Sequence, residues 1–295
     1  MQKIGFIHPN DTAALEALKK IPVLIRKFVL SFLLLCIFPS AGNAQIEKRD
    51  SLINLAYAYH QQKEYLKSNE CFEQAIAIVK PSDEDSRLTN NLRGLIALNY
   101  VCLGVPLFKD KKYAESKICF EKALEYSAND PKVLPFANSW MGDWYSMQAF
   151  QIRIAGSNLQ QAVEYNKFAE KYYTLANAPE KCLKEQISRA MALSDISRIE
   201  EARQLLQQVI QECEGRDKRT NLLAKALNEL GTIEQKAENY QAAILYFERS
   251  YNLNLPSDKK KARIAAQQMQ RLYEFQIPDK TKAELWKKRV DELKD

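Results

Sequence analysis

The sequence has little glycine and almost no histidine, and both shortages narrow what the protein can be. Its 295 residues include 8 Gly and 2 His, of which His8 lies close to the N-terminus. The phosphate-binding patterns GxGxxG and GxxxxGK[ST] and the GxSxG nucleophile turn are absent. A HExxH zinc site needs two histidines, and a histidine-based triad would depend on His60 alone. We therefore expect no enzyme, no catalytic residue, no metal site and no cofactor.

The sequence also lacks a strong excess of one charge. It carries 43 Lys and Arg against 37 Asp and Glu, a net charge of +6, and residues 1–44 hold five of those basic residues and two of the acidic ones. The rest of the chain is therefore at +3, with both signs mixed. A nucleic-acid binder usually gathers basic residues on one face or in runs. The run at 259–261 is interpreted as the solvated start of a helix, and we expect no nucleic-acid partner.

One uncharged apolar run, FVLSFLLLCIF at 28–38, stands out near the N-terminus. Two basic residues precede it, and small residues follow it up to Ala44 and Gln45. This arrangement is typical of a secretory signal peptide cleaved between those two residues. Eleven residues are too few for the roughly 20 that span a bilayer as a helix. We predict a signal peptide at 1–44 with an over-long N-terminal extension, and an exported protein, periplasmic or secreted, without a stable membrane span after cleavage. A retained anchor is the alternative.

Five cysteines follow the predicted cleavage site: Cys71, Cys102, Cys119, Cys182 and Cys213. Their odd number argues against a complete disulfide framework, and neither a CxxC nor a His/Cys pair has the spacing of metal ligands. Free buried thiols are expected for most of them. Cys182 and Cys213 fall at the open ends of two predicted antiparallel helices, so they could form a disulfide in an exported protein.

The sequence repeats itself three times. KEYLKSNECFEQAIAI at 63–78 returns 48 residues later as KKYAESKICFEKALEY, and a looser copy, ENYQAAILYFERSYNL, begins at Glu238. Before each copy, apolar residues recur at spacings of three and four, which predicts a first helix joined to a second by a short turn. Phe72, Phe120 and Phe247 are expected to fill the space toward the next hairpin. One hairpin cannot bury its whole apolar surface, so such units stack.

This pattern resembles the tetratricopeptide repeat, whose signature is W-x₂-L-G-x₂-Y…A-x₃-F…P. The resemblance implies an all-α fold, a right-handed α-solenoid of stacked antiparallel helix pairs, with about five TPR-like units plus a C-terminal capping helix pair over residues 45–295. The clear repeats are 49–82, 97–130 and 224–257, the irregular units are 135–178 and 183–216, and the cap is 258–295. The offset of 48 exceeds the usual period of 34, so we also predict a lengthened helix from about Asp85.

The resemblance further implies a partner-binding groove lined by the first helix of each repeat. The residues that match groove positions are Asn54, Tyr57, His60, Gln61, Phe108, Lys109, Trp140, Asp143, Asn228, Gln235 and Lys236. For the aromatic ones, packing against neighbouring helices is an equally good interpretation. Related domains that hold a chaperone's acidic tail use a Lys/Asn clamp in the first helices. Ile53, Tyr57, Val101 and Val105 occupy those places here, so we expect a mostly apolar partner segment.

These features predict a non-catalytic scaffold or adaptor, exported to the bacterial envelope, that binds a peptide or helix of another protein. A complete chain ending at Asp295 favours the adaptor, because no second apolar run follows the repeats. The alternatives are a periplasmic sensor or input module of a signalling system, which a longer natural chain would favour, and a small-ligand binder, which would need an enclosed pocket.

Overall fold

The computed structural model of the chain describes residues 41–79, 83–216 and 219–294. The predicted signal core at 28–38 lies outside these ranges. Within them every regular element is helical, as the sequence predicts. The chain divides into two compact units, an N-terminal unit that ends at Leu103 and a C-terminal unit that begins at Gly104. The boundary falls inside one long helix, within the predicted repeat 97–130.

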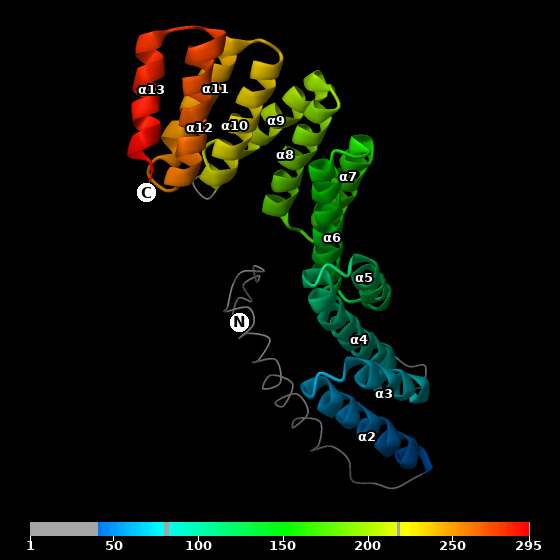
Figure 1. Cartoon of the computed structure of the whole chain (residues 1–295). Coiled ribbons are helices and arrows are strands. Elements are labelled where there is room, and N and C mark those ends of the chain that lie inside the picture. Colours follow the sequence, from blue (N-terminus) through cyan, green and yellow to red (C-terminus); the bar gives the residue numbers. More distant parts are fainter. Residues whose placement is uncertain (1–40, 80–82, 217–218, 295) are drawn as a thin grey trace. The chain divides into compact units, whose positions relative to one another are not determined.

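The N-terminal unit is a helical hairpin followed by most of a third helix. It contains α2 (Ala41–Gln61), α3 (Tyr65–Ile78) and α4 (Asp83–Lys109) as far as Leu103. The first two helices lie side by side (Figure 1). Ala56 and Phe72 are almost fully buried, whereas Leu55, next to Ala56 on α2, is 44% exposed. The lengthened helix predicted from about Asp85 is confirmed as the 27-residue α4, which continues through Pro106.

Residues 86–109 of α4 are long and apolar enough, by composition, to cross a membrane. Their mean hydropathy is 1.3, and 44% of the most apolar window is buried. The buried positions include Leu92, Ile96 and Ala97, at spacings of about one helical turn. This pattern is that of a helix with one core-facing side, which passes the same test of composition. Packing within the described helices therefore uses part of the apolar surface of α4.

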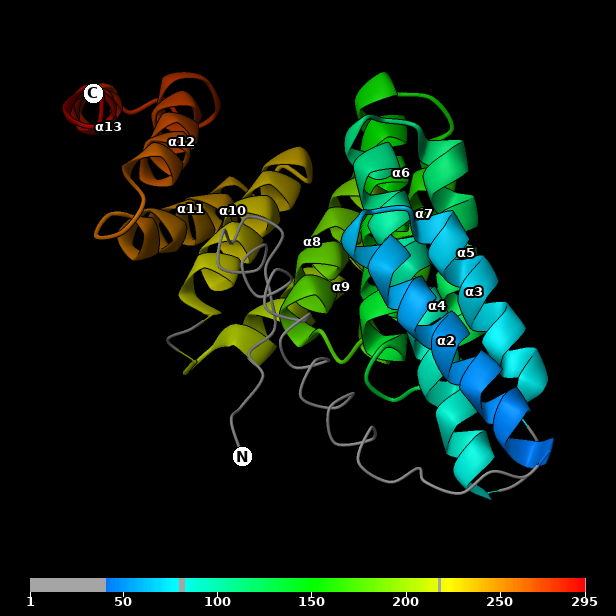
Figure 2. The same ribbon diagram turned by 90° about the horizontal axis from the view of Figure 1, so that it is seen from below.

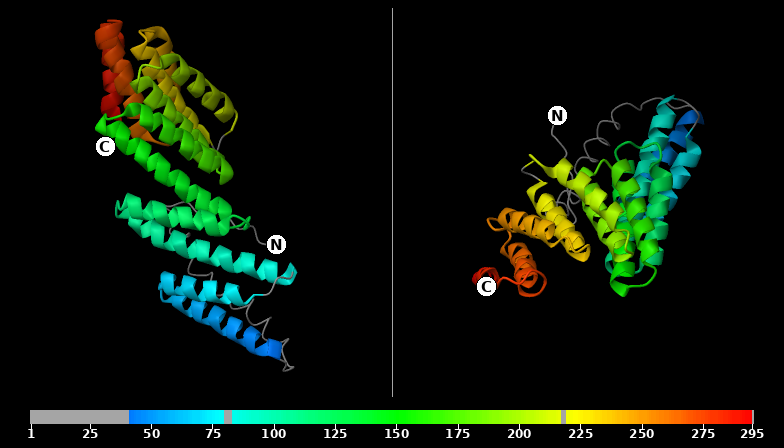
Figure 3. Two further views of the ribbon diagram at one scale, coloured as in Figure 1. Left: turned by 90° about the vertical axis from the view of Figure 1, so that its right-hand side faces the viewer. Right: turned by 90° about the horizontal axis from the view of Figure 1, so that it is seen from above.

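The C-terminal unit continues with helices that pack in sequence order. They are α5 (Tyr113–Ser127), α6 (Leu134–Ala155), α7 (Leu159–Leu175), α8 (Pro179–Asp195), α9 (Ile199–Cys213), α10 (Thr220–Lys236), α11 (Tyr240–Asn254), α12 (Lys259–Arg271) and α13 (Lys280–Glu292). Helices α6 and α7 form one close pair, and α10 to α13 lie side by side (Figures 2 and 3). The first helices α6, α8 and α10 also contact their neighbours in that series.

The turn between the two helices of a pair is built in the same way four times. Three residues join the two helices, and the middle one, Lys63, Lys111, Ser197 or Glu238, has a positive φ of 61° to 63°. In each turn the following N–H bonds back to a carbonyl five residues earlier, as in Glu64 N to Tyr59 O at 2.9 Å. This is the pattern that closes a helix with a left-handed residue. The α6–α7 pair differs and uses Gly156 with φ 65°.

Small residues in the first helices let the second helices approach closely. A Cβ added to Gly231 would lie 2.8 Å from the Phe247 ring, and one added to Gly104 would lie 2.6 Å from the Phe120 ring. Both rings are fully buried. The repeated Gly-to-Phe spacing in the sequence is therefore the contact between the two helices of a pair.

The last helices end the series with a polar outer surface. Helix α12 runs into a short π-helix, η2 (Leu272–Gln276), before α13. Ala283, Trp286 and Val290 of α13 are buried at spacings of three and four, and most residues between them are exposed and charged. This is the arrangement expected of a terminal helix with one face left for solvent.

Candidate interaction surface

In the N-terminal unit the predicted groove residues divide into exposed and structurally engaged ones. Asn54 and Gln61 are exposed on α2, whereas Tyr57 is half-buried with its ring edge-on to Phe72, 5.5 Å between centroids. His60 lies 2.5 Å from Asn99, measured from Nδ1 to Oδ1. His60 is therefore part of a link between α2 and α4.

Asn99 fixes the hydrogen-bonding role of that histidine. Its side chain is fully buried, and its Nδ2 donates to Ser68 Oγ at 2.9 Å and to Asn69 Oδ1 at 2.7 Å. Its Oδ1 must then accept, so His60 Nδ1 is the donor. Buried polar groups that satisfy one another in this way hold neighbouring helices in register. We assign His60 a structural role on this geometry.

In the C-terminal unit two predicted groove aromatics pack on the repeat's phenylalanine. Trp140 of α6 stacks on Phe120, with centroids 5.8 Å apart and an interplanar angle of 18°. Phe108, in the last turn of α4, meets the same two rings at 6.3 Å. Both are half-buried, and Lys109 beside them is exposed. The packing interpretation of these aromatics therefore accounts for most of their surface.

Asp143 is held in place by the next pair of helices. Lys181 Nζ donates to both of its carboxylate oxygens at 2.8 Å, and Tyr173 Oη donates to one of them at 2.8 Å. Lys181 also donates to Ser139 at 2.9 Å. Burial and the neighbouring carboxylate raise the pKa of Tyr173 strongly, which keeps its hydroxyl protonated as a donor. These contacts tie α6 to α7 and α8.

The three predicted groove residues of α10 lie on its polar side. Asn228 and Gln235 are half-buried and Lys236 is exposed. Lys236 Nζ donates to Ser194 Oγ at 3.1 Å and to Asp195 Oδ1 at 3.2 Å on α8. The structure thus places the predicted residues of α6 and of α10 on helices that both contact α8.

An apolar surface lies on α6, and sequence reasoning identified only part of it. Met147 matches a groove position in the same way as Trp140, whereas Phe150 and Ile154 were missed. Phe136, Met147, Phe150 and Ile154 recur with Trp140 at spacings that place them within about 40° of one line along the helix. Phe150 is 53% exposed and Ile154 71% exposed. We call Met147, Phe150 and Ile154 the α6 stripe. The sequence SMQAFQIRIA contains this spacing. Phe150 and Ile154 could therefore have been found by extending the groove positions along α6.

A charged layer borders the α6 stripe on the side of α8. Arg153 Nε donates to Asp195 Oδ2 at 3.0 Å, and Arg153 Nη1 lies 3.8 Å from Met191 Sδ. Asp195 therefore serves two cations, Arg153 and Lys236. Within the described residues Lys225 on α10 makes no ion pair, and burial lowers the pKa of its amine although carboxylates stand nearby.

Two further carboxyl groups are buried beneath this layer. Burial raises the pKa of Glu185 and of Glu170 to about 7 each. Arg189 opposes that effect on Glu170, with Nε 3.1 Å from Oε1. Burial also raises the pKa of Glu229. Part of the negative charge in this region is therefore absent near neutral pH.

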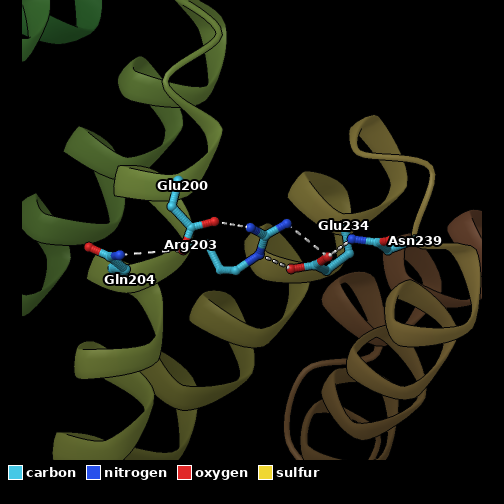
Figure 4. Close-up of polar contacts among 5 residues, drawn as sticks. All are labelled: Glu200, Arg203, Gln204, Glu234 and Asn239. Atoms are coloured by element: carbon cyan, nitrogen blue, oxygen red, sulfur yellow. Dashed lines mark hydrogen bonds and ion pairs between the residues drawn. The ribbon is translucent and has the colours of Figure 1, made fainter.

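A separate ion pair joins α9 to α10 (Figure 4). Arg203 Nε donates to Glu234 Oε1 at 2.6 Å, and Asn239 Nδ2 donates to Glu234 Oε2 at 2.8 Å. Burial alone would raise the pKa of Glu234, but these hydrogen bonds and the guanidinium hold it below its usual value. Glu200 on the exposed side also pairs with Arg203. The cluster is a structural clamp between successive helix pairs.

The five cysteines of the described residues are free thiols, including Cys182 and Cys213. Cys182 Sγ lies 3.8 Å from Thr174 Oγ1, and Cys213 is 1% exposed. Burial raises the pKa of both thiols, which lowers their reactivity. A bridge in the exported protein stays a prediction. Five free thiols counted on the denatured mature protein would rule it out, and a count lower by two would support it.

Across the part of the chain that the structure describes, no three His, Cys, Asp or Glu side chains are grouped so that they could hold a metal ion. The surfaces found there are helical faces with apolar and charged side chains. Such surfaces can bind another macromolecule, and they define a helical-repeat protein with candidate docking faces.

Comparisons with known proteins agree with that class. The tetratricopeptide repeat model matches residues 50–78 and 103–130, two segments that lie within the predicted repeats 49–82 and 97–130. Tetratricopeptide repeats in general mediate protein–protein interactions and are non-enzymatic. No curated protein matches the sequence.

Two solved structures show the same fold. BtubC (BKLC) from P. vanneervenii is 17% identical with a TM-score of 0.53, covering 86% of this chain and 91% of that one. Aspartyl phosphate phosphatase F from Bacillus subtilis is 13% identical with a TM-score of 0.51, covering 88% of this chain and 76% of that one. At this identity the likeness concerns the fold alone.

Proposed function

We propose that the protein is a non-catalytic adaptor that binds a peptide or helix of another protein on the first-helix side of its repeats. The observation that carries this proposal is the α6 stripe. Met147 is half-buried, and Phe150 and Ile154 present most of their apolar surface to solvent. Burying one large apolar side chain is worth about 1.5–3 kcal/mol, so an exposed row of them favours association.

The position of the stripe suits a binding face. It lies on a first helix, the element that lines the partner groove in this repeat family, and its neighbours Asp143 and Arg153 are fixed by ion pairs to α8. A rigid surface loses little conformational freedom when a partner docks. The site proposed here is thus shifted along α6 from Trp140, whose ring already packs on Phe120.

We further propose that the adaptor works outside the cytoplasm, in the bacterial envelope. The support is the basic pair, the apolar run at 28–38 and the small residues before Gln45. The partner would then be another exported or envelope protein. Among the functions considered, a sensor module shares this location and the same binding face.

Site-specific photo-crosslinking in the native host tests the proposal. A photo-reactive amino acid replaces Ile154 in the full chain, and the matched control carries it at Leu245, which is 67% exposed on the second helix α11. We expect a discrete protein adduct from position 154 in the envelope fraction and none from position 245. Equal adducts from both positions, or none from position 154, would contradict the proposal.

A further inference from the structure

The length and backbone of the α6 stripe restrict what can lie on it. From Met147 to Ile154 the α6 stripe is about 10 Å long at 1.5 Å per residue. A helix has no free backbone edge to pair with an extended strand. A helix satisfies its own backbone hydrogen bonds and needs none from the surface when it lies in a groove between helices. The α6 stripe therefore suits about two turns of a docked helix.

The charges beside the stripe restrict the occupant further. The side chains that border it on α6, α8 and α10 are the cations Arg153, Lys181, Lys184, Lys225 and Lys236 and the carboxylates Asp143, Glu185, Asp195 and Glu229. Glu185 is buried and Glu229 is half-buried, and loss of solvation raises the pKa of both carboxyl groups. Asp195 is shared by two cations. The border therefore carries a net positive charge near neutral pH.

Two of these cations are available to a ligand. Lys184 is exposed on α8 and makes no ion pair among the described residues, and the same holds for the half-buried Lys225 on α10. The two amines also repel one another. A carboxylate brought next to them would relieve that repulsion and regain part of the solvation lost by Lys225.

We infer that the occupant is an amphipathic helix with an acidic flank. Its apolar ridge lies along Met147, Phe150 and Ile154, and carboxylates on the flank toward α8 face Lys184 and Lys225. This inference rests on the proposed function, because it names the partner chemistry of the same surface. It concerns positions other than the Lys/Asn clamp of related domains, which this chain lacks in its early first helices.

Selection from a displayed library of helical peptides tests the partner chemistry. The full chain is the immobilised target, the peptides have a fixed leucine ridge, and their flank positions are random. We expect the selected peptides to be enriched in Asp and Glu on one flank relative to the input library. The strongest peptide is then made synthetically, labelled, and titrated by fluorescence anisotropy.

Matched variants locate the binding. Phe150→Ser/Ile154→Ser replaces two exposed side chains and is expected to lower the affinity for the peptide at least about tenfold. Leu245→Ser is expected to leave that affinity unchanged. Lys184→Gln/Lys225→Gln is expected to weaken it by about three- to tenfold and to flatten its salt dependence. The charge control is Lys171→Gln, an exposed lysine on α7. Lys184→Gln alone gives a smaller loss without touching a half-buried position.

The outcomes separate this inference from the proposed function. Selected peptides whose binding depends on Phe150 and Ile154 but whose flanks are neutral or basic would overturn the inferred acidic flank. They would still support the proposed adaptor function. If no selected peptide depends on the stripe, both are overturned. Self-association in sedimentation that disappears in Phe150→Ser/Ile154→Ser would make a second copy the occupant, and stripe-dependent binding to phosphatidylglycerol vesicles would make it a membrane. Either result overturns the inference.

Discussion

Glu185 is a carboxyl group buried among three neighbouring helices. It is 3% exposed, near Ser146 of α6 and Glu170 of α7, and Lys225 of α10 is the nearby cation. With its amide oriented to satisfy both ends, Asn166 donates to Glu185 Oε1 at 2.8 Å. Burial raises its pKa to about 7, so the folded state favours the protonated acid.

Stability should therefore depend on pH through this residue. Because the folded pKa lies above the ordinary value, the folded state binds more protons between about pH 4.5 and 7. The stabilisation is complete below that window and is lost as pH rises through it, on the order of 3 kcal/mol. Glu185→Gln, which mimics the neutral acid, is expected to be more stable than the wild type at pH 8 and similar at pH 5.

Urea unfolding at the two pH values measures this difference. Glu164→Gln is the control, because Glu164 is on α7 and pairs with Lys167 at the surface. Its stability relative to the wild type should change little between pH 5 and 8. The prediction is wrong if Glu185→Gln changes the free energy of unfolding by the same amount at pH 5 and at pH 8. That result would show that Glu185 is ionised in the folded state at pH 5.

The contact between Gly231 and Phe247 is the second residue-scale feature that can be tested. The Cβ of Gly231→Ala would lie 2.8 Å from a fully buried ring. Overpacking typically costs 1–3 kcal/mol, whereas alanine gains about 1 kcal/mol of helix propensity over glycine. We expect a net loss of about 1 kcal/mol in the free energy of unfolding.

A double-mutant cycle identifies the cause. In a Phe247→Leu background the ring is gone, so Gly231→Ala should be neutral or stabilising there. Denaturant midpoints and slopes of the four proteins provide the coupling energy. If Gly231→Ala costs the same in both backgrounds, contact with Phe247 is not what keeps position 231 small.

At the scale of elements, polar clamps join successive helix pairs in the C-terminal unit. Glu234 stands on α10 three residues after Gly231, where the repeat signature has tyrosine, and its side chain is 6% exposed. Arg203 of α9 reaches it from the preceding pair. The tyrosine position of the repeat has thus become an interhelical ion pair.

Removing one partner of this ion pair should lower the free energy of unfolding more than replacing both partners with apolar residues. Glu234→Ala leaves Arg203 and Asn239 without their buried partner, and we expect a loss of about 2–3 kcal/mol in the free energy of unfolding. Arg203→Met/Glu234→Leu removes both charges together and should lie within about 1 kcal/mol of the wild type. Chemical denaturation of both variants measures the contrast. A double variant as unstable as Glu234→Ala would mean that the pair itself stabilises the fold.

At the scale of the whole molecule, the sequence predicts the repeats well because each contact between paired helices is local. The spacing from Gly104 to Phe120 or from Gly231 to Phe247 is short enough to read along the chain, and the terminal helix pair follows from its polar pattern. No comparable sequence pattern predicts the change from α12 to the π-helix η2 at Leu272. Helix boundaries were predictable to within a few residues, as α4 shows.

The candidate site was less predictable, because exposure depends on what neighbouring helices supply. Trp140 matches a groove position, but the end of α4 places Phe108 and α5 places Phe120 against it. Ile154 lies beyond the repeat signature and remains exposed because no described helix covers it. Long-range ion pairs such as Arg203 to Glu234 require the packing of two helix pairs, which letter spacing alone does not define.

The predicted export of the protein can be tested at the start of α2, where the predicted cleavage site lies. Helix α2 begins at Ala41, whereas the predicted cleavage lies between Ala44 and Gln45, so the scissile bond is inside its first turn. A signal peptidase needs this bond in an extended chain. We therefore expect cleavage to precede folding of α2, and the mature protein to begin at Gln45.

Terminal sequencing and fractionation of the expressed full chain measure this outcome. Leu34→Arg places a charge in the apolar run, at a cost of about 2.5–3.5 kcal/mol for membrane insertion, and should leave uncleaved protein in the cytoplasm. Leu34→Met keeps the run apolar and should be processed as the wild type is. Full-length wild-type protein in the membrane fraction would instead indicate a retained anchor. The adaptor would then act beside the membrane, with the α6 stripe still free for its partner.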